Sequence, residues 1–435
     1  MKTPFLSTWL LLTVKIAVVL AIFLAQLTWG NLLQGDLASL FCVLIVSIIN
    51  FLLLASCCAV FRAEDLFTAM THHPALIFAL LLLSTALLMA FTPPAFSWDG
   101  LSFWFRDAAR VSNSVSNISF FAANDQPNTL IVYYSIVARG ASGWANYFIA
   151  WDLFVLWVGS VSVAVSYSNA GARARAFTLL WFLLLPHPLL LNHVFLVGYA
   201  EMWIGALITV SPFLCDRLLL SSTSFLDKLL LGFVGFCFFA IKDSGFLYLA
   251  VVCAAAFLVF CQVRSKMFVS IIISCMLCLL AFSEISVDPL FGIAQPDFIV
   301  KLGGHSVGLD LFASGLNFNN FDSIVHAFLK NQSFSLTAIL MFCFALIAKR
   351  SREAWTVRLK ISISILFIGF AMICLLPLKI EYFYVYGAPA TDTSFSRMFL
   401  PLLPLTGTLL AVSIDQISSR SEWRERTSLS GDLTV

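Results

Sequence analysis

Long apolar runs separated by short polar segments make up most of the chain. The first run extends from Leu6 to Trp29 and contains a single charged residue, Lys15. A helix of about 20 apolar residues crosses the hydrocarbon core of a bilayer, so runs of this length predict membrane-spanning helices. With the first run, about twelve spans (10–13) are expected. The others lie near 37–61, 75–93, 144–167, 177–194, 199–215, 228–242, 244–262, 267–286, 333–348, 360–378 and 396–416.

The composition supports an all-α polytopic membrane protein. The chain is 60% hydrophobic and 11% charged, with a mean hydropathy of +0.96, whereas soluble proteins carry roughly 25% charged residues. So few charges cannot cover a water-soluble globule. We expect one transmembrane domain over residues 1–435 in contact with a lipid bilayer. The net charge of +2 gives no reason to expect a nucleic-acid partner.

The basic residues orient the chain in the membrane. With the N-terminus in the cytoplasm, sixteen of the 25 lysines and arginines fall on the cytoplasmic side and eight outside, as the positive-inside rule requires. Lys15 is the remaining one, and it either faces the bundle interior or snorkels to the surface. We therefore expect cytoplasmic termini, a cytoplasmic tail over 418–435, and external loops over 94–143, 287–332 and 379–395.

The first external loop opens on a carboxylate. Asp99 follows the Pro93-Pro94 break and stands between Trp98 and Gly100. A carboxylate at the membrane surface can accept a proton from a hydroxyl nucleophile. It can also cap a helix that begins at Gly100. The two roles are compatible.

An amphipathic segment follows this carboxylate. Four residues can share an apolar face, namely Leu101, Trp104, Phe105 and Ala108, while Arg106 and Arg110 lie four residues apart on another. The pattern predicts a juxtamembrane helix lying on the membrane, whose arginines could contact a lipid phosphate.

A polar turn that contains Gln126 and Asn128 comes next, before the short apolar stretch 130–134. This stretch is too short to span a membrane. It is either an ordinary loop or the second half of a re-entrant or interfacial platform.

Further charged residues stand at predicted helix ends on the external side. Glu201 lies at the mouth of an otherwise apolar helix, and an acid at such depth indicates function. Lys242 and Asp243 separate two apolar runs, and Arg397 opens the last one. The lysine and arginine could hold a phosphate. Alternatively, Lys242 pairs with Asp243 in a tight turn, and Arg397 snorkels.

Metal ligation is weakly indicated. His187, His193 and Glu201 lie near the same external edge, but their spacing matches no established metal motif. We expect no metal site and no cofactor, with a divalent cation as the open alternative. The eleven cysteines lie in or beside apolar runs, where they indicate buried thiols rather than a disulfide framework.

Several of these motifs, in this order, resemble the GT-C glycosyltransferases, especially bacterial members related to the protein mannosyltransferases and lipid A aminoarabinose transferases. Residues 98–103 with Arg106 resemble the first external loop of that family. The resemblance extends over most of residues 90–410. Its other elements are Gln126-Pro127-Asn128, Gly198-Tyr199-Ala200-Glu201, Lys242-Asp243-Ser244-Gly245, and Arg397 with Leu400-Pro401-Leu402-Leu403-Pro404. Gly100 stands where the family commonly has a second acid, and two extra spans precede the loop.

The resemblance implies a transferase at the external face of a bacterial inner membrane. The donor would be a polyprenyl-phosphate-linked sugar, and the acceptor a hydroxyl of a glycan, lipid or protein, with inversion at the sugar. Each candidate residue would then have one role. Asp99 would be the general base; Lys242, Arg397 and Arg106 would bind the donor phosphate; Glu201, Asp243 or Asp107 would be a second acid or contact the acceptor; Trp98, Trp104, Gln126 and Asn128 would form the loop platform.

Three other classes remain as alternatives. A lipid-linked polysaccharide polymerase or ligase would use a histidine in a large late loop, and 287–332 offers only His305 and His326. A transporter or flippase for lipid-linked sugars would carry charges at mid-membrane and repeated halves, for which Lys15 and Asp152 are the nearest candidates. A structural membrane subunit would carry no site at all.

The transferase hypothesis makes a geometric prediction. Asp99, Glu201, Lys242 and Arg397 should converge on one external cavity that opens sideways to lipid. Their location on separate surfaces would contradict it.

Overall fold

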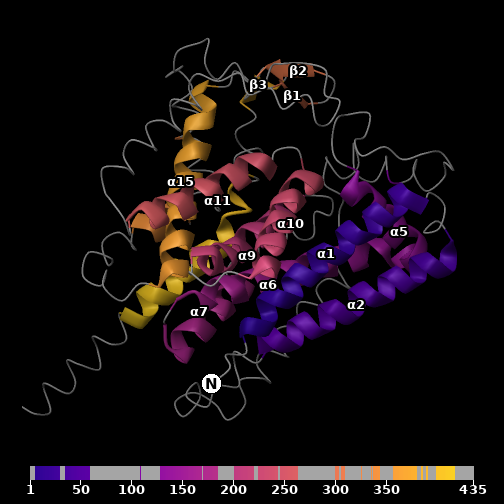
Figure 1. The fold of residues 1–435 in the computed structure, drawn as a ribbon, viewed down its shortest axis with the longest axis horizontal. Helices are drawn as coiled ribbons and strands as arrows, with labels where there is room; N and C mark the ends of the chain where they lie inside the picture. Colours follow the sequence, from indigo (N-terminus) through magenta and orange to yellow (C-terminus); the bar gives the residue numbers. More distant parts are fainter. Residues whose placement is uncertain are drawn as a thin grey trace, which may run out of the picture.

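The computed structural model shows a helical bundle with two small β-hairpins (Figure 1). It describes residues 5–29, 35–58, 108, 128–168, 170–184, 200–219, 224–242, 245–262, 299–302, 305–308, 325, 335, 337–342, 356–379, 384–385, 388–389 and 398–416.

The N-terminal half of the bundle is built on two long helices. α1 (Phe5–Trp29) and α2 (Asp36–Cys58) pack against each other, and α5 (Thr129–Ala141) packs against both (Figure 1). One 3-10 turn, Ser142–Trp144, joins α5 to α6 (Ala145–Ser166), which packs on all three. Almost the whole of α6 is buried, so it forms the centre of this half.

The other half surrounds α9 (Glu201–Leu219), which packs on α6. α10 (Phe225–Ile241), α11 (Gly245–Gln262) and α15 (Val357–Lys379) contact α9, while α7 (Ala172–Leu184) packs on α6. A further helical segment follows over 403–416.

A capping box starts α10. The Ser224 hydroxyl accepts a hydrogen bond from the Asp227 backbone N–H at 3.1 Å, and the Asp227 carboxylate accepts one from the Ser224 backbone N–H at 3.3 Å. The Ser224 hydroxyl also donates to this carboxylate at 2.8 Å. These bonds, together with the nearby Arg217 guanidinium, hold the pKa of Asp227 below its usual value.

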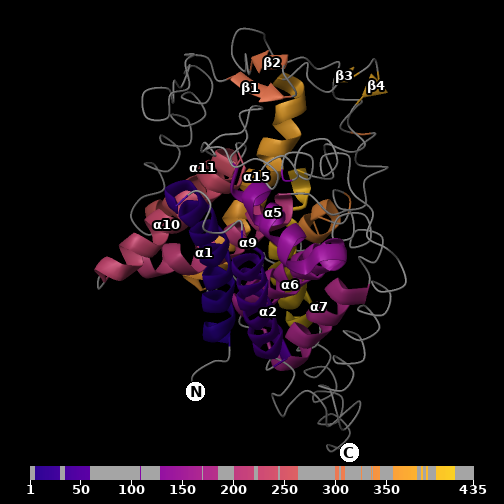
Figure 2. The ribbon, with the colours of Figure 1, turned by 90° about the vertical axis from the view of Figure 1, so that its right-hand side faces the viewer.

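The two hairpins lie at one end of the bundle. β1 (Ile299–Leu302) pairs antiparallel with β2 (His305–Gly308), and β3 (Tyr384–Val385) pairs antiparallel with β4 (Ala388–Pro389). Figure 2 shows both hairpins at the end where α15 finishes, opposite the start of α1. They belong to the two later segments that the sequence predicts as external loops.

Within the part of the chain that the structure describes, four helices are long and apolar enough to cross a membrane, namely Thr8–Thr28, Asp36–Cys57, Ala145–Ser166 and Val357–Cys374. The expectation of a helical membrane protein is confirmed to that extent. The full set of twelve spans stays a prediction. Several predicted runs lie wholly or largely outside the described residues, and the helices over the predicted runs 199–215, 228–242 and 244–262 are not among these four.

The stretch 130–134 was predicted either as an ordinary loop or as part of a re-entrant or interfacial platform, and the first of these predictions is wrong. It is not an ordinary loop, because it lies in the helix α5, whose residues 129–137 are all buried. α5 is too short to cross a bilayer alone, so its burial depends on α1, α2 and α6 around it.

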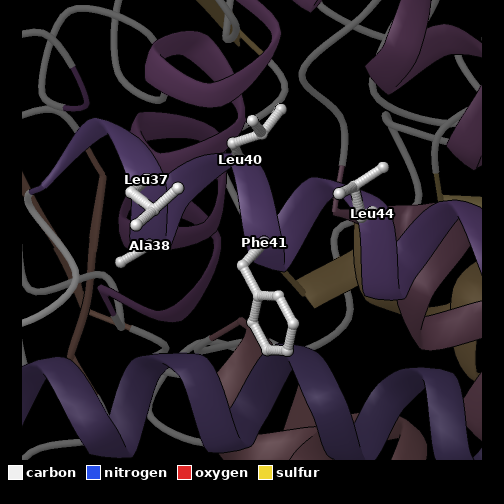
Figure 3. A pocket seen from close by; sticks show the side chains of 5 residues that line it. All are labelled: Leu37, Ala38, Leu40, Phe41 and Leu44. Atoms are coloured by element: carbon white, nitrogen blue, oxygen red, sulfur yellow. The ribbon is translucent and has the colours of Figure 1, made fainter.

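One face of α2 carries apolar side chains that no described residue covers. Leu37, Phe41, Leu44, Ile48 and Phe51 are exposed at helical spacing, while the opposite face is buried. Figure 3 shows the start of this face, where Leu37, Ala38, Leu40, Phe41 and Leu44 line a groove of about 430 Å³. The apolar side chains of these five residues suit contact with lipid acyl chains.

Two helical glycines provide a test of this packing. A Cβ on Gly140 would lie 2.6 Å from the Ser39 carbonyl oxygen, whereas a Cβ on Gly232 meets nothing within 4 Å. Gly140→Ala should therefore separate α5 from α2 and cost about 1–3 kcal/mol. Gly232→Ala should stabilise α10 by about 0.5–1 kcal/mol. Thermal unfolding in detergent measures both, and equal shifts would contradict the close approach of α5 to α2.

Candidate functional site

An ion pair joins the start of α9 to the end of α10. The Lys242 Nζ donates to Glu201 Oε1 at 2.6 Å, and the side chains are 18% and 7% exposed, respectively. Glu201 is the first residue of α9. Lys242 follows the last residue of α10, where its extended backbone ends that helix. The pair is therefore partly shielded from solvent but keeps some solvent exposure.

The position of each charge suits the helix end that carries it. Glu201 lies at the N-terminus of α9 and Lys242 at the C-terminus of α10, where the two helix dipoles favour a negative and a positive charge, respectively. The turn after Lys242 is tight, because the Gly245 N–H donates to the Lys242 carbonyl at 2.9 Å. A Cβ at Gly245 would collide with the Phe238 carbonyl oxygen, so only glycine fits there.

The structure thus brings together two residues that the sequence places in separate motifs. Lys242 was expected either to pair with Asp243 or to bind a phosphate, and its partner here is Glu201, 41 residues earlier. Asp243 lies outside the described residues. A phosphate that binds Lys242 would have to share the Lys242 ammonium group with Glu201.

The segment that begins after Arg397 packs beside this pair. The Tyr248 hydroxyl, near the start of α11, donates to the Met398 carbonyl at 2.8 Å. The Pro401 backbone lies against Gly205, one turn after Glu201, where a Cβ would be 3.3 Å from the Pro401 Cα. The start of α9, the start of α11 and residues 398–401 therefore adjoin.

Among the residues predicted to form the loop platform and the amphipathic segment, the structure describes Asn128 and Ala108. Trp98, Asp99, Trp104, Arg106, Asp107, Gln126 and Arg397 lie outside the described residues. Asn128 is buried at the start of α5, where its carbonyl accepts from the Val132 N–H at 2.9 Å. Ala108, from the predicted amphipathic segment, is helical and buried.

A second ion pair is completely buried in the bundle. Lys15 Nζ in α1 lies 2.7 Å from Asp152 Oδ1 in α6, and the side chains are 0% and 1% exposed. The sequence marks both as charges within spans but does not join them. Lys15 faces the interior as one alternative predicted, and the snorkelling alternative is wrong.

Two neutral residues complete this buried network. Asn50 in α2 accepts from Lys15 Nζ at 2.7 Å and donates to Asp152 Oδ1 at 2.8 Å. The Tyr133 hydroxyl in α5 donates to Asp152 Oδ2 at 2.9 Å. Lys15 gives its remaining bond to the Asp152 carbonyl at 2.9 Å. Neither Asn50 nor Tyr133 is among the residues predicted to be functional, although an asparagine within an apolar run is a recognisable signal.

No metal-type cluster of three His, Cys, Asp or Glu side chains occurs among the described residues. His187 and His193, the candidate partners of Glu201, lie outside them.

The Glu201–Lys242 pair should show measurable coupling. In a double-mutant cycle with Glu201→Gln and Lys242→Met, we expect about 1–2 kcal/mol, between the values for exposed and buried pairs. Chemical unfolding in mixed micelles provides the free energies. The control cycle uses Arg139 and Asp36, whose atoms are 3.8 Å apart and whose acid is 96% exposed; it should show no measurable coupling. Equal coupling in the two cycles would contradict the assignment.

Comparison with known proteins adds no relative, since no protein-family model, curated protein or solved structure matches the chain significantly.

Proposed function

We propose that the chain is an integral-membrane glycosyltransferase of the GT-C type. It would transfer a sugar from a polyprenyl-phosphate-linked donor to an acceptor hydroxyl at the external face of a bacterial inner membrane. The proposal rests on the ion pair between Glu201 Oε1 and Lys242 Nζ, which are 2.6 Å apart. These two residues belong to two separate motifs of the resemblance to the GT-C glycosyltransferases. The packing of Met398 and Pro401 beside them is a second support.

The proposed reaction is a single displacement. Asp99 takes the proton of the acceptor hydroxyl, and the hydroxyl oxygen attacks the anomeric carbon from the face opposite the phosphate. The bond between this carbon and the phosphate oxygen breaks, and polyprenyl phosphate leaves with the bonding electrons. The product sugar therefore has inverted configuration.

The cations of the site would stabilise the leaving phosphate. Lys242, Arg397 and Arg106 supply positive charge that is already in place when negative charge develops on the phosphate oxygen. In the state described here, Glu201 holds the Lys242 ammonium at 2.6 Å. Donor binding would draw Lys242 toward the phosphate while Glu201 keeps it oriented.

The transporter alternative receives less support. Its expected mid-membrane charges, Lys15 and Asp152, pair with each other and receive further bonds from Asn50 and Tyr133. A substrate would have to break several of these bonds to reach either charge. No described contact favours the polymerase or ligase alternative.

Asp99→Asn tests the proposed base. The variant should fold like the wild type but lose transfer about 100-fold or more, since a positioned general base contributes at least that much. The assay measures the polyprenyl phosphate released from a panel of polyprenyl-phosphate hexoses in proteoliposomes.

Asp322→Asn is the matched control, because it removes another carboxylate from a predicted external loop. It should keep full turnover. Retained turnover in Asp99→Asn would remove Asp99 as the base, and no release by the wild type from any donor would overturn the transferase assignment.

A further inference from the structure

The buried network fixes four helices at one point. Lys15, Asn50, Tyr133 and Asp152 come from α1, α2, α5 and α6, and their hydrogen bonds and ion pair are 2.7–2.9 Å long. All four side chains are buried. Each of these short bonds sets the rotation and depth of its helix relative to the others.

Stability alone does not account for charged residues at this position. Transfer of a lysine and an aspartate out of water costs several kcal/mol per ion, and well-packed apolar residues of similar volume often stabilise a protein equally or better. Unlike apolar packing, the hydrogen-bonded ion pair fixes the relative orientation of its groups, because hydrogen bonds require specific distances and angles. The network is therefore suited to fix the orientation of a neighbouring side chain.

Trp203 in α9 lies against this network. The Lys15 ammonium lies 5.8 Å from the centre of the Trp203 ring, within the range of a cation–π interaction. The Tyr133 ring meets the same indole edge-on, with centroids 5.6 Å apart and an interplanar angle of 78°. Trp203 is fully buried and stands two residues after Glu201, in the first turn of α9.

We propose that Lys15 and Asp152, with Asn50 and Tyr133, are positioning residues. They orient Trp203 and thereby fix the first turn of α9, so that Glu201 meets Lys242. The network contacts the indole that follows Glu201 by two residues. It acts through the Trp203 ring, at the boundary between the two halves of the bundle.

The proposal rests on the proposed function only in treating Glu201 and Lys242 as a functional site. Its test therefore measures geometry and uses neither donor nor acceptor. Cysteines at Glu201→Cys and Lys242→Cys are cross-linked with a short bifunctional thiol reagent in lipid nanodiscs. Mass spectrometry identifies the linked peptides, because the chain has eleven native cysteines. The initial cross-linking rate reports how closely the start of α9 and the turn at Lys242 approach each other when the ion pair itself is absent.

Three variants in this background separate positioning from general stability. Trp203→Leu removes the ring that Lys15 and Tyr133 contact, and the rate should fall about tenfold. Trp203→Phe keeps an aromatic ring and should stay within about twofold of the parent. The double variant Lys15→Met/Asp152→Leu keeps an apolar core and should match Trp203→Leu.

Trp157→Leu is the matched control. Trp157 is also buried, but it lies in α6 and packs on Phe182, to whose carbonyl its Nε1 donates at 3.3 Å. This variant should lose stability in thermal unfolding and keep the parental cross-linking rate.

A parental rate in folded Trp203→Leu would overturn the proposal, as would an equal fall in Trp157→Leu. If Trp203→Leu does not fold, a parental rate in the double variant overturns it. A normal cross-linking pattern without glycosyl transfer would instead contradict the proposed function alone.

Discussion

The arrangement of the N-terminal helices depends on one buried ion pair. Lys15 and Asp152 lie 2.7 Å apart with no access to solvent. A bilayer offers no water to replace a missing partner, so removal of either residue would leave a charge in apolar surroundings. Asn50 and Tyr133 occupy most of the remaining bonding positions. The network therefore permits one relative arrangement of α1, α2, α5 and α6 and disfavours others.

Two ion pairs of the bundle, Lys15–Asp152 and Glu201–Lys242, have different chemical capacities. The Lys15–Asp152 pair is sealed, and a ligand could reach it only by breaking bonds that nothing else replaces. The Glu201–Lys242 pair lies at helix ends and keeps some exposure, so either partner can exchange its contact for a ligand at lower cost. The buried pair is suited to fix geometry and the exposed pair to bind a ligand. Trp203 contacts Lys15 of the buried pair and stands two residues after Glu201 of the exposed pair.

Small residues allow the close contacts that connect these features. Apolar association gives little net attraction between helices in lipid, so close backbone approach matters more there than in water. Gly140 lets α5 reach α2, Gly205 admits the Pro401 backbone, and Gly245 leaves room for the Phe238 carbonyl. Each glycine lies where a Cβ would press on backbone atoms of another segment or of the preceding helix.

The sequence alone determined the membrane class and much of the helix plan, because run length and hydropathy are local properties. The run from Leu6 to Trp29 predicts α1, observed from Phe5 to Trp29, and the run 144–167 predicts α6, observed from Ala145 to Ser166. The same local reasoning marked Lys15, Asp152, Glu201 and Lys242 as unusual charges. Asp99 stays a prediction of this kind.

Only the tertiary structure decided which charges meet. Lys15 and Asp152 are 137 residues apart, and Glu201 and Lys242 are 41 apart. Their pairing depends on the rotation and depth of whole helices, which packing sets and no local pattern encodes. The same reason explains α5, whose apolar residues are too few to span a membrane and become helical and buried because three neighbouring helices surround them.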